Sequence, residues 1–270
     1  MPRPGSRLSI AACLTFAVLF AAFPEDNKAT FTVSPPPVGY PDFKAGDATQ
    51  QAGGGAVVIK TDTSGLSGWL IGVSGAWQYQ YSPKDDLALG ASAGATFMVG
   101  DQNSLMFASV PLGASVAAEL ATWRGSTLYA LGYLGVTLGY TSLKVTVPQY
   151  LPYLDPVYDE TTLGTMSGVL SAGGGGQVNI ALGGFVLSPF ALWTFSGGVY
   201  STSQSSSMSF VYPTTSGDIP LSLNSVYGFD LLYKPMGWSL SSQLRMGDGY
   251  RMFSMALRWL LRGIKDRARG

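Results

Sequence analysis

Four ionisable residues share one face of segments in which polar and apolar residues alternate: Glu119, Asp230, Arg245 and Arg258. A carboxylate or guanidinium group placed at membrane depth costs free energy, so such residues mark ion pairs or a polar pathway. Opposite charges would pair across a narrow interior and close it, whereas in a wider interior they would line a pore. The residues alone leave both alternatives open.

Six further polar residues fall on the same face: Lys60, Gln78, Gln80, Gln177, Asn179 and Gln243. Together with the four ionisable residues they predict a polar, weakly charged interior surface. These ten residues are our candidates for a lumen lining.

The chain contains no histidine and one cysteine, Cys13. Ser-His and Asp-His active sites are therefore excluded, and so is the commonest zinc ligand. A hydrolase would need an unusual Ser/Lys or carboxylate arrangement, and no convergent set is visible. We expect no enzyme activity, no cofactor and no metal. The run Gly173–Gly176 lacks the Lys-Ser/Thr pair of a phosphate loop and indicates a strand whose backbone is closely approached.

One segment between strands combines aromatic and acidic residues: Tyr150, Tyr153, Asp155, Tyr158, Asp159 and Glu160. Carboxylates could hold a calcium ion and tyrosines could contact a partner, but the spacing is not that of an EF-hand loop. We interpret the segment as a solvated external loop with partner-binding candidates.

The elements that would position these residues are strands. In Trp69–Tyr81 every second residue is mostly apolar, and the residues between them are mostly small or polar. This period of two is typical of a strand with one apolar face. Similar runs predict ten strands, at residues 55–61, 66–81, 87–99, 105–121, 126–144, 164–182, 185–200, 221–233, 238–246 and 250–261.

Composition agrees with many strands facing lipid. Charged residues make up 12% of the chain, hydrophobic residues 46%, and there are 35 glycines. The 16 basic and 16 acidic residues balance, so no net field favours nucleic acid, and we expect no nucleic-acid partner.

The connections between the predicted strands alternate in length. Those at 82–86, 122–125, 183–184 and 234–237 are short and fall on one side, which we assign to the periplasm. The long connections, 144–163 and 201–220, fall on the other. Six aromatic residues lie near the short turns and predict an interfacial girdle: Tyr79, Tyr81, Trp123, Tyr233, Trp238 and Trp259.

Residues 55–261 resemble bacterial outer-membrane β-barrel proteins in general, on this pattern of alternation and on the apolar, aromatic closing run Phe253–Trp259. The resemblance implies an all-β, antiparallel, up-and-down transmembrane barrel of about ten strands, located in the bacterial outer membrane and contacting its lipid. The chain departs from the pattern by continuing into a basic tail, 262–270.

The N-terminal region adds an export signal. Arg3 and Arg7 precede an apolar run, Ile10–Phe23, that is too short to span a bilayer comfortably. We expect a cleavable signal peptide over 1–21 and a flexible lead-in segment over 22–54, with a folded plug as the alternative for the latter.

Two other fold classes fit parts of the sequence. Ser126–Leu143 could pass for a membrane helix with a Gly-x-x-x-Gly packing spacing. A soluble β-sandwich would alternate similarly, but its outward face would carry more Lys, Glu and Asp. Under the barrel interpretation, the leading functional hypothesis is a small passive channel for small-molecule solutes. The alternative is a structural or adhesive barrel with a side-chain-filled lumen and external loops that bind ligands or partners.

Overall fold

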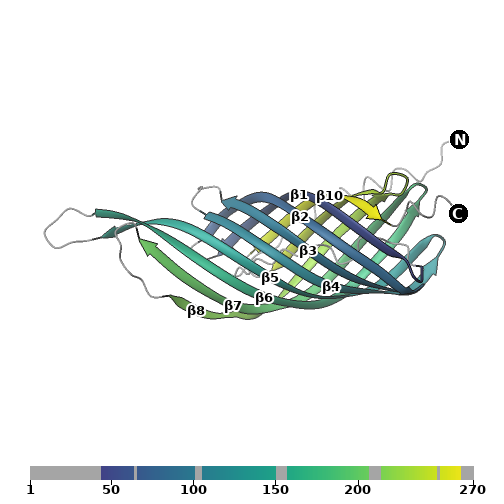
Figure 1. Ribbon diagram of the computed structural model, residues 1–270, viewed down its shortest axis with the longest axis horizontal. Coiled ribbons are helices and arrows are strands. Elements are labelled where there is room, and N and C mark those ends of the chain that lie inside the picture. Colours follow the sequence, from purple (N-terminus) through teal and green to yellow (C-terminus); the bar gives the residue numbers. More distant parts are fainter. Residues whose placement is uncertain are drawn as a thin grey trace.

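The computed structural model describes residues 44–63, 66–100, 105–149, 157–206, 214–247 and 250–262. They form a closed barrel of antiparallel strands in which each strand pairs with its neighbours in sequence and β1 pairs with β10 (Figure 1). The ten strands are β1 Ala48–Thr63, β2 Leu66–Lys84, β3 Leu87–Gly100, β4 Leu105–Trp123, β5 Ser126–Gln149, β6 Val157–Leu182, β7 Phe185–Ser206, β8 Thr215–Tyr233, β9 Trp238–Gly247 and β10 Tyr250–Arg262. The predicted ten-stranded, up-and-down β-barrel is confirmed. The predicted signal peptide lies outside the described residues.

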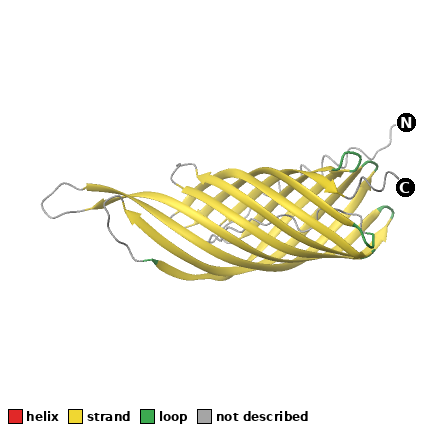
Figure 2. Ribbon diagram, viewed as in Figure 1, coloured by secondary structure: helices red, strands yellow, loops and turns green. Residues whose placement is uncertain are grey.

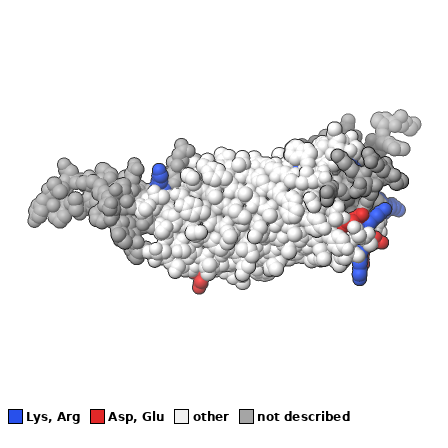
Figure 3. Space-filling view, viewed as in Figure 1, with Lys and Arg blue, Asp and Glu red and all other residues white. Residues whose placement is uncertain are grey.

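The two faces of each strand differ as the alternation predicts. On β2, Trp69, Ile71 and Val73 are 50–64% exposed on the outside, whereas the intervening Leu70 is 2% exposed. On the side of the barrel shown in Figure 3, the middle of the outer surface is almost free of charge, and charged side chains gather mainly at the end that carries the short turns. In the described residues, no helix has the length and apolar character needed to cross a membrane.

The height of the apolar outer surface follows from strand geometry. From Trp69 to Tyr81 there are twelve residue steps along β2, or about 40 Å of strand. A tilt of about 40° reduces this to about 30 Å along the barrel axis, close to the hydrocarbon thickness of a bilayer.

The end with the short turns also holds the start of β1 and the end of β10 (Figure 2). Glycines with positive φ complete three of these turns, Gly125 at 83°, Gly183 at 63° and Gly237 at 66°. Predicted girdle residues lie beside them: Trp123 and Trp259 are about half exposed, and the rings of Tyr233 and Trp238 are 5.8 Å apart. Four short connections therefore lie at one end, as predicted.

The opposite end differs from the prediction. The connections expected over 144–163 and 201–220 are mostly strand: β5 continues to Gln149, β6 begins at Val157, β7 continues to Ser206 and β8 begins at Thr215. Pairing between β5 and β6 is continuous from Ser126↔Ile180 to Gln149↔Val157. The prediction was wrong because Thr, Ser and Val pair well as strands without an apolar face to mark them. These strands project beyond the rest of the barrel (Figure 1).

The start of the barrel also differs. β1 begins at Ala48, so residues 48–54 belong to the barrel and not to a flexible lead-in segment. Gly53–Gly55 suggested a flexible segment, but they are strand residues. A Cβ atom on Gly53 would overlap Arg258, and one on Gly55 would overlap the backbone of β10. These glycines therefore permit close approach.

The tetraglycine run Gly173–Gly176 lies within β6, as the strand interpretation predicts. A Cβ atom on Gly175 would meet the backbone of β7, with Leu192 Cα only 2.7 Å away. A Cβ atom on Gly176 would make ordinary contact, 3.6 Å from the backbone oxygen of Tyr129.

These neighbouring glycines give a matched test. Gly175→Ala should lower the free energy of unfolding by about 1–3 kcal/mol, because overpacking must displace backbone. Gly176→Ala should change it by less than about 0.5 kcal/mol. Urea titration of the protein in detergent, read by heat-modifiable gel migration, measures both. Equal effects of the two substitutions would contradict the close packing of β6 on β7.

Candidate functional site: the barrel lumen

Most of the predicted lumen residues lie buried on the inner face of the strands. They are Gln78, Gln80, Gln177, Asn179, Asp230, Gln243, Arg245 and Arg258, each 3–7% exposed. Glu119 is half-buried near the turn end of β4, where the Thr122 hydroxyl donates a hydrogen bond to its carboxylate at 2.6 Å.

Lys60 is not a lumen residue. Val57 and Ile59 occupy the inner face of β1 and are 0% exposed, while Lys60 is exposed on the outer face beside Trp69. The prediction failed because Val57, Val58 and Ile59 are all apolar, so this short run does not define which residues point inward.

Of the acidic and aromatic loop candidates, Tyr150, Tyr153 and Asp155 lie outside the described residues. The other three, Tyr158, Asp159 and Glu160, belong to β6, where they pair with Pro148, Val147 and Thr146 of β5. They are therefore strand residues and not loop residues.

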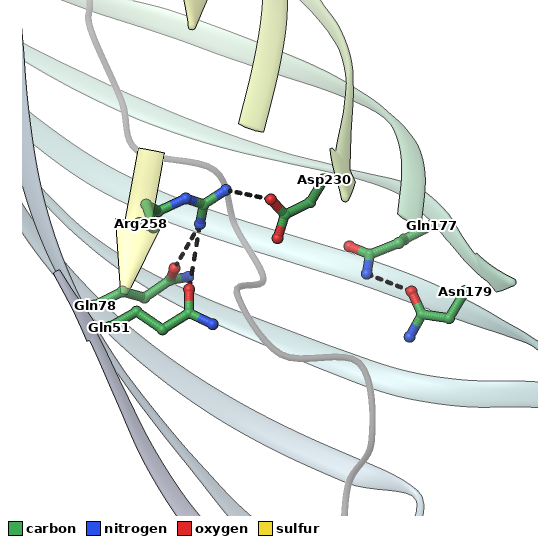
Figure 4. A network of polar contacts seen from close by, with 6 residues as sticks. All are labelled: Gln51, Gln78, Gln177, Asn179, Asp230 and Arg258. Atoms are coloured by element: carbon green, nitrogen blue, oxygen red, sulfur yellow. Dashed lines mark hydrogen bonds and ion pairs between the residues drawn. The ribbon is translucent and has the colours of Figure 1, made fainter. Parts of the chain in front are cut away.

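Arg258 is the centre of the polar interior (Figure 4). Its Nη2 atom is 3.2 Å from Oδ1 of Asp230 on β8. Its Nη1 atom donates to the side-chain oxygens of Gln78, at 3.4 Å, and Gln51, at 3.5 Å. These partners come from β1, β2 and β8. One side chain of β10 therefore connects strands on both sides of the β1–β10 pairing that closes the barrel.

Small neighbours allow Arg258 to lie flat against the wall. Its register partners are Gly53 on β1 and Ser239 on β9. Gly53 leaves open the path toward Gln78, and the short Ser239 side chain leaves open the path toward Asp230. Gln51 was not predicted, although its position two residues before Gly53 on the same face of β1 could have indicated it.

A second polar pair lies further along the wall. On β6 the Gln177 amide donates to Oδ1 of Asn179 at 2.7 Å (Figure 4). Both side chains are buried, so they satisfy part of each other's hydrogen-bonding capacity away from water.

Apolar clusters also occupy the inner face, and the sequence did not lead us to expect them. Near the end opposite the short turns, a group of buried apolar residues packs together: Val57, Ile59, Leu70, Met98, Phe107, Tyr250 and Met252, called the upper cluster below. A middle cluster consists of Ala88, Ala117, Tyr129, Leu131, Tyr133, Phe190, Leu192 and Val226. The sequence does contain a feature that could have predicted these clusters. Leu70, Met98 and Met252 place large apolar side chains on a face whose other residues are mostly small or polar.

A hydrogen-bonded group adjoins the upper cluster. The Tyr250 hydroxyl donates to Oδ1 of Asn224 at 3.1 Å, and the Asn224 amide donates to the Ser196 hydroxyl. A Cβ atom on Gly247 would overlap both Tyr250 and Asn224, so this glycine lets the two side chains meet across β9. Asn224 is 0% exposed.

A small cavity of about 50 Å³ is lined by residues of β1–β4, β9 and β10. Gly53, Ser74, Gly94, Ser241 and Arg258 are among its lining residues. Two buried polar atoms of that lining, Arg258 Nε and Ser241 Oγ, have no hydrogen-bond partner in the protein. Its size and lining suit a few water molecules. In the described residues, no three His, Cys, Asp or Glu side chains gather into a possible metal site.

Comparisons with known proteins found no matching protein-family model and no matching curated protein. Among solved structures, the chain is similar to the translocator domain of the autotransporter NalP from Neisseria meningitidis, with 10% identity, 80% of this chain and 88% of that chain covered, and a TM-score of 0.44. It is also similar to the outer-membrane protease OmpT from Escherichia coli, with 9% identity, 80% of this chain and 96% of that chain covered, and a TM-score of 0.47. A third similar structure is an outer-membrane channel from Pseudomonas putida F1, with 10% identity, 84% of this chain and 100% of that chain covered, and a TM-score of 0.36. These likenesses concern the barrel fold alone, and the three proteins differ in activity.

The Arg258–Asp230 pair generates a stability prediction. Arg258→Met or Asp230→Leu alone should lower the free energy of unfolding by about 3–5 kcal/mol, because each leaves a buried charge without its partner. The double variant should recover most of this loss. Urea unfolding in detergent measures all three, with Lys84→Met, an exposed lysine at the turn end, as the control. Additive losses in the double variant would show that the two side chains do not interact.

Proposed function

We propose that this protein is an outer-membrane β-barrel whose lumen is closed to solutes and which holds the projecting strands β5–β8 beyond the membrane for partner binding. The membrane location is supported by the large exposed apolar side chains of the outer face and by the height of that apolar surface, about 30 Å. Closure of the barrel supports it too, since a sheet in lipid must leave no unpaired edge.

The observation that carries the proposal is the burial of the inner face. Val57, Ile59 and Met98 are 0% exposed, and so is the polar Asn224. A water-filled pore leaves its lining residues accessible to water. Since both apolar and polar inner residues are buried, the geometry favours the filled lumen over the passive channel.

The projecting strands supply the surface for partners. Within the described residues, β5 beyond Leu143 pairs only with β6, and β8 before Ser225 pairs only with β7. Two strand edges are therefore left without a strand neighbour in the barrel. A hydroxyl contact of 3.0 Å between Thr165 and Thr202 adds to the backbone pairing of β6 with β7. An edge with free backbone groups is a known mode of peptide recognition.

Planar-bilayer recording tests closure of the lumen. The wild-type protein should give no discrete conductance, because the upper cluster fills the lumen. Met98→Ser combined with Met252→Ser should raise the frequency of channel openings, since it removes two large side chains from that cluster. Ile71→Ser, on the outer face of β2, is the matched control and should stay silent. Steady conductance of the wild-type protein would contradict the proposal.

Cysteine labelling tests the membrane location and orientation. Ser205→Cys lies in the projecting part of β7 and Asp85→Cys in a short turn, and both positions are exposed. In intact cells a membrane-impermeant maleimide should label only Ser205→Cys, while disruption of the outer membrane should expose both. Labelling of Asp85→Cys alone in intact cells would show that the barrel has the opposite orientation in the membrane. Recovery of the protein as a soluble periplasmic species would refute the membrane location.

A further inference from the structure

The small cavity of about 50 Å³ lies where short side chains of neighbouring strands face one another. Gly53 of β1 is the register partner of Ala76 on β2 and of Arg258 on β10. Ser74 of β2 is the register partner of Thr96 on β3. All five residues line the cavity. Because four of them are short, volume remains unfilled beside the long Arg258 side chain.

The lining of this cavity is rich in hydrogen-bond donors. Six of its residues carry a donor group in the side chain: Ser74, Thr96, Ser241, Gln243, Ser254 and Arg258. In the part of the chain that the structure describes, no Asp or Glu residue belongs to the lining. A lining with a cationic donor and no carboxylate favours an anion over a cation.

Two donors of the lining have no hydrogen-bond partner in the protein, Arg258 Nε and Ser241 Oγ. Both residues are 3% exposed. Ser241 is the register partner of Ala256, which lies two positions before Arg258 on the same face of β10, so the two donors are near each other on the cavity wall. A buried donor without an acceptor costs free energy. An acceptor in the cavity would therefore stabilise both groups.

The positive charge of Arg258 is only partly balanced by its partners. Its ion pair with Asp230 is made through Nη2 at 3.2 Å, which is longer than the roughly 2.7–2.9 Å of most charge-assisted hydrogen bonds. Its Nη1 atom contacts Gln78 and Gln51, which are neutral. We propose that the cavity binds a small monovalent inorganic anion of the size of chloride, held by Arg258 Nε and the Ser241 hydroxyl. The site would form whether or not the projecting strands bind a partner.

The volume of the cavity limits the size of this anion. About 50 Å³ exceeds the roughly 10–15 Å³ that one water molecule requires, so a chloride ion fits with water beside it. An organic anion of the size of a sugar, such as gluconate, is too large.

Chlorine nuclear magnetic resonance of the full barrel in nonionic micelles tests the site, because the chloride signal broadens when the ion exchanges with a binding site. Sodium gluconate keeps the ionic strength constant. The wild-type protein should broaden the signal, and bromide, a competing halide, should reverse the broadening. Ser241→Ala should raise the dissociation constant about tenfold, since it removes a hydrogen bond to a charged ligand. The matched control is Ser242→Ala on the opposite face of β9, beside the exposed Met255, and it should leave binding unchanged.

Asp230→Asn distinguishes an anion from water in the cavity. This substitution keeps the shape of the Asp230 side chain and removes a negative charge next to Arg258. Chloride should therefore bind more tightly to the variant than to the wild-type protein. Heat-modifiable migration on a gel checks that each variant is folded.

Three results would overturn the anion site: no broadening by the folded wild-type protein, equal affinities of the wild-type protein and Ser241→Ala, or an affinity that does not rise in Asp230→Asn. The first result would indicate that the cavity holds water alone. Any of them in a barrel that conducts no ions would refute the anion site and leave the proposed closed lumen intact.

Discussion

The structure depends on one requirement, that every backbone N–H and C=O group within an apolar surrounding finds a partner. The barrel meets it by pairing β1 with β10 from Gln50↔Arg262 to Thr61↔Tyr250, which joins segments about 200 residues apart in sequence. Once this seam is closed, alternate side chains must point outward or inward. The outward side chains can then be apolar without packing into a protein core. The inward side chains must share the narrow space inside the barrel.

The narrow space explains why small residues are as important inside as large ones. Arg258 reaches partners on three other strands because Gly53 and Ser239 leave room beside it. Tyr250 reaches Asn224 across β9 in the same way, past Gly247. These contacts support the proposed closed lumen, in which Arg258 and Asp230 pair with each other.

The sequence predicted the fold well because membrane strands repeat one simple pattern, and all ten predicted strands lie within the observed strands. Its failures have local causes. Lys60 was placed inside because the apolar run before it has no alternation. The projecting parts of β5–β8 differ from the predicted loops because their Ser- and Thr-rich segments pair as strands without a regular apolar alternation. The partners of Arg258 could not be derived, because they depend on the register between segments such as Gln51 and Arg258 that are far apart in sequence.

The most direct test of the account is the environment of the outer face. Nitroxide labels introduced along β2 at Leu70, Ile71 and Val73 would be examined by electron paramagnetic resonance in lipid bilayers. Labels at Ile71 and Val73, both more than half exposed, should collide with lipid-soluble oxygen and be protected from a water-soluble nickel complex. The label at Leu70, on the inner face and 2% exposed, should be shielded from both. Ready access of the nickel complex to Ile71 and Val73 would contradict contact with lipid and, with it, the membrane barrel.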